Sequence, residues 1–156
     1  MTVDNNLVLR KAHTYDFLQI AELDRCSWND GWASQYVPDG EHVWRLWVEY
    51  ALVFCCFEGK KLVGVSLAFP TINNTFAVHK IFVHYDFRDK GIGTLLFNQL
   101  IEEMDKYDKD SFLTVSPENN AAIKLYKNLG YETEELINGY YREDEHRIIM
   151  KRHFLK

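Results

Sequence analysis

The sequence is poor in the residues that interrupt regular structure, with three prolines and eight glycines among 156 residues. Disordered and fibrous chains are rich in such residues, and this composition excludes both classes. Hydrophobic residues make up 47% of the chain and charged residues 26%, which is typical of a globular protein. A chain of this length buries about two-thirds of the surface that its unfolded form exposes. Because no internal repeat or low-complexity linker divides it, we expect one domain over residues 1–156.

Cysteine is scarce as well. Its three copies are Cys26 and the adjacent pair Cys55 and Cys56. That spacing fits neither a disulfide framework nor a metal site, so we expect no bound metal. All three are predicted to be small buried hydrophobic residues without a redox role.

The chain has neither an excess of positive charge nor a long apolar run. Its formal net charge is −5 and its pI is about 5.7. Phosphate contacts need clustered lysine and arginine, so a broad nucleic-acid surface is excluded and a cationic or neutral partner is favoured. No apolar run reaches the length of roughly 18 residues that a membrane span needs, and residues 1–17 do not have the pattern of a signal peptide. We therefore expect a cytoplasmic protein that binds no membrane.

Hydrophobic periodicity predicts alternating blocks of strands and helices. The predicted order is strand, helix, helix, three strands, helix, strand, helix and two strands, which implies a mixed sheet flanked by helices. Asp16 is a plausible N-cap of the first helix, and Gly130 is expected at the C′ position of the last. The apolar faces expected for the first two helices are Phe17, Ile20, Ala21 and Asp24, and Val43, Leu46, Trp47 and Tyr50.

Residues 86–96, DFRDKGIGTLL, place two glycines directly before the third predicted helix. Such a turn presents backbone N–H groups at the positive end of the helix dipole and lets an anion approach closely. Arg88 and Lys90 add positive charge, and Thr94 adds a hydroxyl donor. The alternative is that Gly91 and Gly93 only form a tight strand-to-helix turn. The stretch fits neither the Walker phosphate loop nor the dinucleotide fingerprint.

The pattern R-x-x-G-x-G does fit, through Arg88, Gly91 and Gly93 after a predicted strand. With it the chain resembles the GNAT superfamily of N-acetyltransferases. Residues 118–131, ENNAAIKLYKNLGY, resemble a second segment of that family. The matching positions are Asn119, Ala122, Leu125, Tyr126, Gly130 and Tyr131. The resemblance implies an α/β (α+β) domain with a mixed, mostly antiparallel sheet of six to seven strands flanked by about four helices.

The resemblance also implies acetyl-coenzyme A (acetyl-CoA) as the cofactor. In such proteins the glycine turn holds the pyrophosphate through backbone amides, and the preceding strand pairs with the pantetheine arm. The cofactor-binding residues implied here are Ile81, Phe82, Val83, Arg88, Asp89, Lys90, Gly91, Ile92, Gly93, Thr94, Asn119 and Tyr126.

Acetyl transfer to an amine needs a neutral amine and a proton for the departing thiolate. Tyr126 stands at the family's position for the proton donor, and the alternative is that it is an aromatic core residue. Many relatives carry a glutamate base on the fourth strand, but residues 75–83 contain no acidic residue. His79 occupies that strand, expected on the same face as Ile81 and Val83. It is our candidate base, because histidine accepts a proton near neutral pH; the alternative is a structural histidine.

The loop between the first two helices interleaves aromatic and acidic residues, including Trp28, Asp30 and Trp32. Aromatic faces beside carboxylates suit an ammonium group, and the alternative is that the tryptophans pack beneath the loop. The resemblance places the acceptor beside this loop and the last two strands, where Tyr140 matches one of a tyrosine pair in protein N-terminal acetyltransferases. Those enzymes commonly carry a glutamate on the fifth strand, where this chain has Thr114.

We therefore predict an acetyl-CoA-dependent N-acetyltransferase that transfers the acetyl group directly to a primary amine of a small molecule within a ternary complex. Two alternatives are open: a protein or peptide N-terminal acetyltransferase, and a non-catalytic acyl-CoA sensor. Dimers are common in the superfamily, and the strand-rich C-terminal region offers edges to pair, so a homodimer is the expected assembly.

Overall fold

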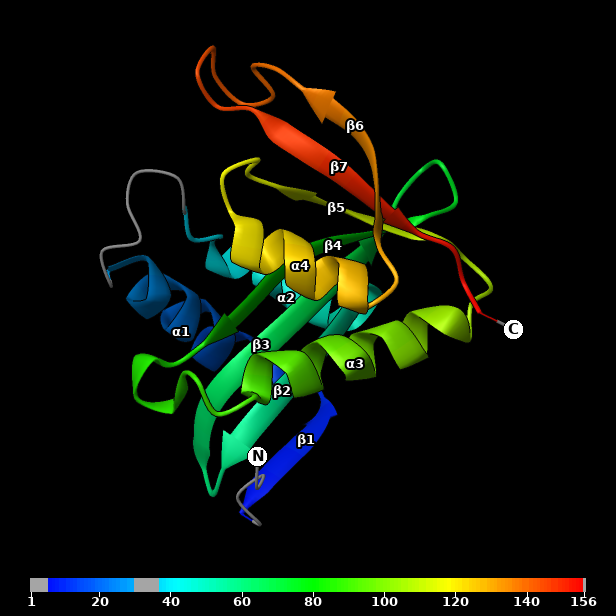
Figure 1. Ribbon diagram of the computed structural model, residues 1–156. Coiled ribbons are helices and arrows are strands. Elements are labelled where there is room, and N and C mark those ends of the chain that lie inside the picture. The colour runs from blue at the N-terminus through cyan, green and yellow to red at the C-terminus, as the bar shows by residue number, and fades with distance from the viewer. Residues whose placement is uncertain (1–5, 30–36, 156) are drawn as a thin grey trace. The chain divides into compact units, whose positions relative to one another are not determined.

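The structure is a computed structural model that describes residues 6–29 and 37–155, apart from the side chains of Trp28 and Asn29 (Figure 1). The strands are β1 Leu7–Lys11, β2 Leu52–Glu58, β3 Lys61–Pro70, β4 Phe76–Val83, β5 Ser111–Val115, β6 Glu132–Ile137 and β7 Arg147–Arg152. The α-helices are α1 Phe17–Asn29, α2 Glu41–Tyr50, α3 Ile92–Asp105 and α4 Asn120–Asn128. Short 3-10 helices lie at η1 Thr14–Asp16 and η3 Tyr85–Phe87. The predicted order of strands and helices is confirmed.

The strands form a seven-stranded sheet in the order β1-β2-β3-β4-β5-β7-β6. The pairs β1–β2, β2–β3, β5–β7 and β6–β7 are antiparallel. In contrast, β4 runs parallel to β5, with Phe76 opposite Ser111 and Ala77 opposite Phe112. The predicted mixed, mostly antiparallel sheet is therefore confirmed.

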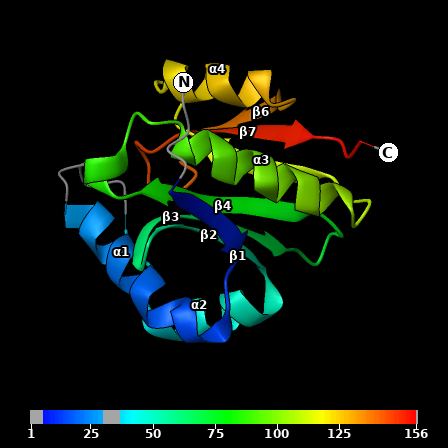
Figure 2. The ribbon, with the colours of Figure 1, turned by 90° about the horizontal axis from the view of Figure 1, so that it is seen from below.

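The chain divides into two compact units. The first comprises the described residues of Met1–Phe69 and His79–Glu103, and the second comprises Pro70–Val78 and the described residues of Met104–Lys156. In the first unit, α1 and α2 cover one face of the strands and α3 covers the other (Figure 2). None of the helices in the described part of the chain has the length and apolar character to cross a bilayer.

The core of the first unit lies between the strands and the helix pair α1 and α2. Ile20 and Ala21 of α1 and Trp44 of α2 are completely buried. The face predicted for α2 is wrong by about one position, because Leu46 and Tyr50 are exposed. The reason is a polar contact: the Trp44 indole N–H donates a hydrogen bond of 3.0 Å to Asp24, which turns Trp44 inward.

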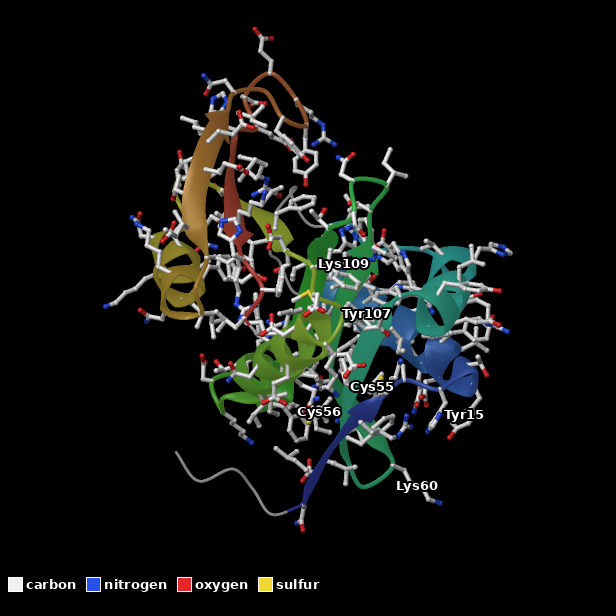
Figure 3. All side chains as sticks on the ribbon, turned by 90° about the vertical axis from the view of Figure 1, so that its right-hand side faces the viewer. Tyr15, Cys55, Cys56, Lys60, Tyr107 and Lys109 are labelled. Atoms are coloured by element: carbon white, nitrogen blue, oxygen red, sulfur yellow. The ribbon has the colours of Figure 1, made fainter. Side chains whose placement is uncertain are left out.

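The two adjacent cysteines lie on β2, where Figure 3 labels them. Cys55 and Cys56 are both buried, as predicted. Burial raises the pKa of Cys55 to about 12 and also raises the pKa of Cys56. The prediction is wrong for Cys26, which is exposed because α1 turns Ile20 and Ala21 to the core instead.

In the second unit, α4 ends at Asn128 and Leu129 is its C-cap. The next residue, Gly130, has a φ of +96°, which confirms the predicted C′ position. Arg152 donates two hydrogen bonds to Asp105, at 2.7 and 3.0 Å. The ring of Phe76 packs edge-on against Tyr107, and the Lys109 ammonium lies over the same ring. Tyr107 and Lys109 are labelled in Figure 3.

Asp16 joins the end of β1 to the start of α1. Its buried carboxylate accepts hydrogen bonds from both terminal nitrogens of Arg10, at 2.8 and 3.1 Å, and from the His13 N–H at 2.7 Å. The carboxylate thus points back toward β1. The prediction that Asp16 caps α1 is therefore wrong, because Arg10 and the His13 N–H take up its oxygens. Burial alone would raise the pKa of Asp16, but the hydrogen bonds from Arg10 and His13 outweigh it and lower the pKa below 3.8.

We expect Asp16→Asn to reduce the free energy of unfolding at pH 7 by about 2 kcal/mol, because Arg10 loses its charged partner. A carboxyl whose pKa is lowered by folding contributes stability above its unfolded pKa of about 3.9, and that stability is lost as the pH falls through the folded value. The difference between wild type and variant should therefore shrink below pH 4. Urea unfolding at pH 7 and pH 3 measures it, with the exposed Asp144→Asn as the control. Equal differences at both pH values would contradict the prediction.

Candidate functional site

The glycine turn lies between the end of β4 and the start of α3. Asp89 and Gly91 have φ values of +62° and +81°, in the left-handed region that favours glycine. The Arg88 side chain folds back, and its Nε–H donates a hydrogen bond of 3.0 Å to the Val83 carbonyl. Arg88 therefore ties the turn to the strand that precedes it.

The N-terminus of α3 opens directly onto this turn. The Leu95 N–H donates a hydrogen bond of 3.1 Å to the Gly91 carbonyl. The N–H groups of Ile92, Gly93 and Thr94 come before that bond in the helix, at its positive end. A Cβ at Gly93 would meet only Val83 Cγ2, at 3.9 Å. The residues from Arg88 to Thr94 thus form the predicted turn between strand and helix. That its N–H groups hold an anion stays a prediction.

Gly64 of β3 sets how closely α3 approaches the sheet. A Cβ at Gly64 would lie 2.8 Å from Leu96 Cδ1 and 3.0 Å from Ile92 Cγ2, closer than side chains pack. Both helix residues are buried. Sequence reasoning missed this role, although a glycine inside a strand pattern is itself a signal of close backbone approach.

His79 lies in β4 next to a carboxylate and two aromatic rings. Its Nε2 is 3.0 Å from Asp39 Oδ2, and its ring centroid is 5.3 Å from that of Trp47 and 5.7 Å from that of Phe69. The predicted face shared with Val83 is wrong: Val83 lies near Gly93 of α3, whereas His79 contacts α2. The face shared with Ile81 stays a prediction.

The cause is an interruption of the strand alternation. Successive side chains of a regular strand point to opposite faces. Here the consecutive residues His79 and Lys80 both contact Asp39 Oδ2, with Lys80 Nζ at 2.7 Å.

Lys80 also forms a buried ion pair with Asp24 of α1. Its Nζ lies 3.1 Å from both carboxylate oxygens of Asp24 and donates a 2.9 Å hydrogen bond to the Val37 carbonyl. Asp24 is completely buried and also accepts a 2.8 Å hydrogen bond from the Asp39 N–H. Sequence reasoning missed this cluster, although an acid on the apolar face of the first helix was a signal for it.

Of the other predicted site residues, three lie in the second unit and three belong to the first helix or the segment after it. The Asn119 side chain caps α4 by accepting a 3.1 Å hydrogen bond from the Ala122 N–H. Burial raises the pKa of Tyr126 above 10. Tyr140 is 39% exposed and packs edge-on against Tyr141. Asp30 and Trp32 lie outside the described residues, and of Trp28 the structure describes only the backbone, in the last turn of α1.

The family model for the acetyltransferase (GNAT) family matches residues 17–131. The chain belongs to this family. The match includes both the glycine turn and the second segment, so the resemblance that the two motifs predicted is confirmed.

The curated relatives of this GNAT chain match only part of their own length. An uncharacterised N-acetyltransferase of Methanocaldococcus jannaschii is 46% identical over 66 residues, which are 42% of this chain and 29% of that protein. The chain spans about a third of the length of the curated relatives that it matches, at 29% and 35%.

Solved structures of the GNAT fold match nearly the whole chain. The ribosomal-protein-S18-alanine N-acetyltransferase of Escherichia coli has a TM-score of 0.80 at 22% identity, over 96% of this chain and 95% of that one. The yncA protein of Salmonella typhimurium, solved with its cofactor acetyl-CoA, has a TM-score of 0.78 at 18% identity, over 97% and 96%. At these identities the likeness concerns the fold.

We expect Gly64→Ala to reduce the free energy of unfolding by about 1–3 kcal/mol, because the added methyl group pushes α3 away from β3. Gly93→Ala is the matched control, since its Cβ meets an ordinary contact and alanine favours a helix. Urea unfolding of the two variants compares them directly. A Gly64→Ala protein as stable as wild type would show that α3 does not depend on this glycine.

Proposed function

We propose that the chain transfers an acetyl group from acetyl-CoA to the primary amine of a small molecule, within a ternary complex. The observation that carries the proposal is the glycine turn at the N-terminus of α3, inside the segment that the GNAT family model matches. The likeness to yncA, which was solved with acetyl-CoA, supports the choice of cofactor.

The donors of the turn fit a pyrophosphate group. The N–H groups of Ile92, Gly93 and Thr94 lie at the positive end of α3, and Lys90 is exposed beside them. Acetyl-CoA, when bound, supplies an acetyl group activated as a thioester. The residues that would hold it are those from Arg88 to Thr94, the backbone of Ile81, Phe82 and Val83, and Asn119.

His79 and Tyr126 are the residues that we assign to proton transfer. His79 is exposed, so an acceptor amine can reach its ring. Burial raises the pKa of Tyr126, so its phenol is protonated at neutral pH. The role that we assign to it is to give that proton to the departing thiolate.

The surroundings of His79 support a cationic acceptor. Asp39 supplies a carboxylate, and Trp47 and Phe69 supply aromatic rings within 6 Å of the imidazole. Carboxylates and aromatic faces together suit an ammonium group.

Protein N-terminal acetylation is the second candidate, since Tyr140 and Tyr141 form an exposed pair on the β6–β7 connection.

Gly93→Asp separates cofactor binding from folding. The added Cβ has room, and an acidic residue in the first turn favours a helix, so the melting temperature without ligand should not fall. The same charge repels a pyrophosphate, so we expect acetyl-CoA to bind at least about tenfold more weakly.

The measurement is a thermal-shift titration with acetyl-CoA. A ligand at about a hundred times its dissociation constant stabilises the folded protein by roughly 2.7 kcal/mol. Gly93→Ala, which adds the Cβ without the charge, is the control. Equal affinity of Gly93→Asp and wild type would place the pyrophosphate elsewhere.

Acceptor-dependent release of coenzyme A thiol tests the reaction itself. We expect release with small primary amines, and a kcat about a hundredfold lower in Tyr126→Phe with the KM for acetyl-CoA unchanged, because only the proton donor is lost. Tyr107→Phe, the same change at an exposed tyrosine, should keep the wild-type rate.

The other outcomes of this assay identify the alternatives. Release with free N-terminal peptides only would establish the protein acceptor in place of the small amine. Binding of acetyl-CoA without release on any amine would make the chain a sensor. A Tyr126→Phe enzyme with the wild-type kcat would remove Tyr126 from the chemistry.

A further inference from the structure

Asp39 is fixed through both its backbone and its side chain. Its N–H donates to the buried carboxylate of Asp24 at 2.8 Å, and its Oδ2 lies 2.7 Å from Lys80 Nζ. The same Oδ2 lies 3.0 Å from His79 Nε2. One carboxylate oxygen therefore serves two partners, of which Lys80 is nearly buried and His79 is exposed.

The protonation of Asp39 determines which atom of this pair carries the hydrogen. Burial alone would raise the pKa of Asp39, but the hydrogen bonds from His79 and Lys80 outweigh it and lower the pKa below 3.8. At neutral pH Asp39 is a carboxylate, which can only accept hydrogen bonds. His79 Nε2 must therefore be the donor and carry the hydrogen.

A neutral imidazole with its hydrogen on Nε2 has a lone pair on Nδ1. Among the residues that the structure describes, none forms a hydrogen bond with His79 Nδ1. The rings of Trp47 and Phe69 pack against the imidazole and restrict its rotation. Nδ1 is thus the ring nitrogen left to act on another molecule.

The groups packed around His79 come from several elements. Asp39 Oδ2 contacts it from the segment before α2, and α2 and β3 contribute the rings of Trp47 and Phe69. Asp39 Oδ2 is also paired with Lys80 of β4, which in turn pairs with Asp24 of α1.

We propose that Asp39 is the positioning residue of the acetyl transfer: it holds His79 as the Nε2–H tautomer, so that Nδ1 removes a proton from the acceptor ammonium. This inference rests on the proposed function. In the step an N–H bond of the ammonium breaks and an Nδ1–H bond forms, which leaves a neutral amine with a lone pair and an imidazolium paired with Asp39. The proton then leaves to water, which restores the neutral ring.

The first test needs no substrate. Nitrogen-15 NMR of the full chain with labelled histidine distinguishes the two tautomers of His79, and we expect Nε2–H in the wild type. Asp39→Asn should shift His79 toward the Nδ1–H form, because an amide can also donate. Glu49→Gln, which removes a carboxylate of α2 that pairs with Arg45, is the control and should change nothing. A wild-type Nδ1–H tautomer, or a tautomer unchanged in Asp39→Asn, would overturn the inference.

The second test measures turnover with a primary amine. Asp39→Asn and His79→Gln should each lower kcat about ten- to a hundredfold with the KM for acetyl-CoA unchanged, and the double variant should lose little more, because Asp39 acts through His79. Losses that multiply in the double variant would overturn the inference.

Asp39→Glu keeps the charge and covers the case in which Asp39→Asn folds poorly. We expect Asp39→Glu to retain the Nε2–H tautomer of His79 and to have a higher kcat than Asp39→Asn. If Asp39→Glu retains that tautomer but is as slow as Asp39→Asn, the positioning role is contradicted. A wild type with no acceptor-dependent turnover would reject the proposed function alone, since the tautomer measurement still decides the role of Asp39.

Discussion

The buried ion pair between Asp24 and Lys80 is the interaction on which the first unit depends. A charge buried without a partner is so costly that breaking such a pair costs about 3–5 kcal/mol. Here the two charges come from α1 and β4, and the Trp44 indole of α2 and the Asp39 N–H complete the hydrogen bonding of Asp24. Asp24 and Lys80 therefore have all these hydrogen-bond partners only when α1, α2 and β4 are packed together as in the structure. That requirement selects the face of α2 that turns inward and fixes the segment that leads into it.

β4 links the two parts of the candidate site in the first unit. One end of the strand feeds the glycine turn, and His79 stands four residues earlier, about 13 Å away along an extended chain. Because Gly64 lets α3 lie directly on the neighbouring strand, the turn is held by packing as well as by its own backbone conformation. A single strand that carries both the proposed anion site and the proposed proton acceptor fits a reaction in which a long cofactor presents one end to an amine.

Local signals predicted the order of the elements and the glycine turn, because periodicity and short motifs depend on neighbouring residues. They could not predict which side of α2 is buried, since Trp44 turns inward to reach Asp24, twenty positions earlier. The same limit applies to His79. Its candidacy followed from the strand that it occupies, but its partner Asp39 is forty positions away, and the broken alternation at Lys80 follows from a tertiary contact. Asp24 was visible as an acid on an apolar face, yet its partner was not.

The adjacent free cysteines of β2 bear on the stability of any thioester that this chain binds. A thiolate attacks a thioester and takes over its acyl group, whereas an un-ionised thiol reacts poorly. Burial raises the pKa of Cys55 to about 12 and also raises that of Cys56, so neither sulfur is ionised to a useful extent at neutral pH. The protein's own core therefore does not compete with the acceptor by thiol–thioester exchange, and an activated acyl group is protected from capture by the β2 thiols of the protein that binds it.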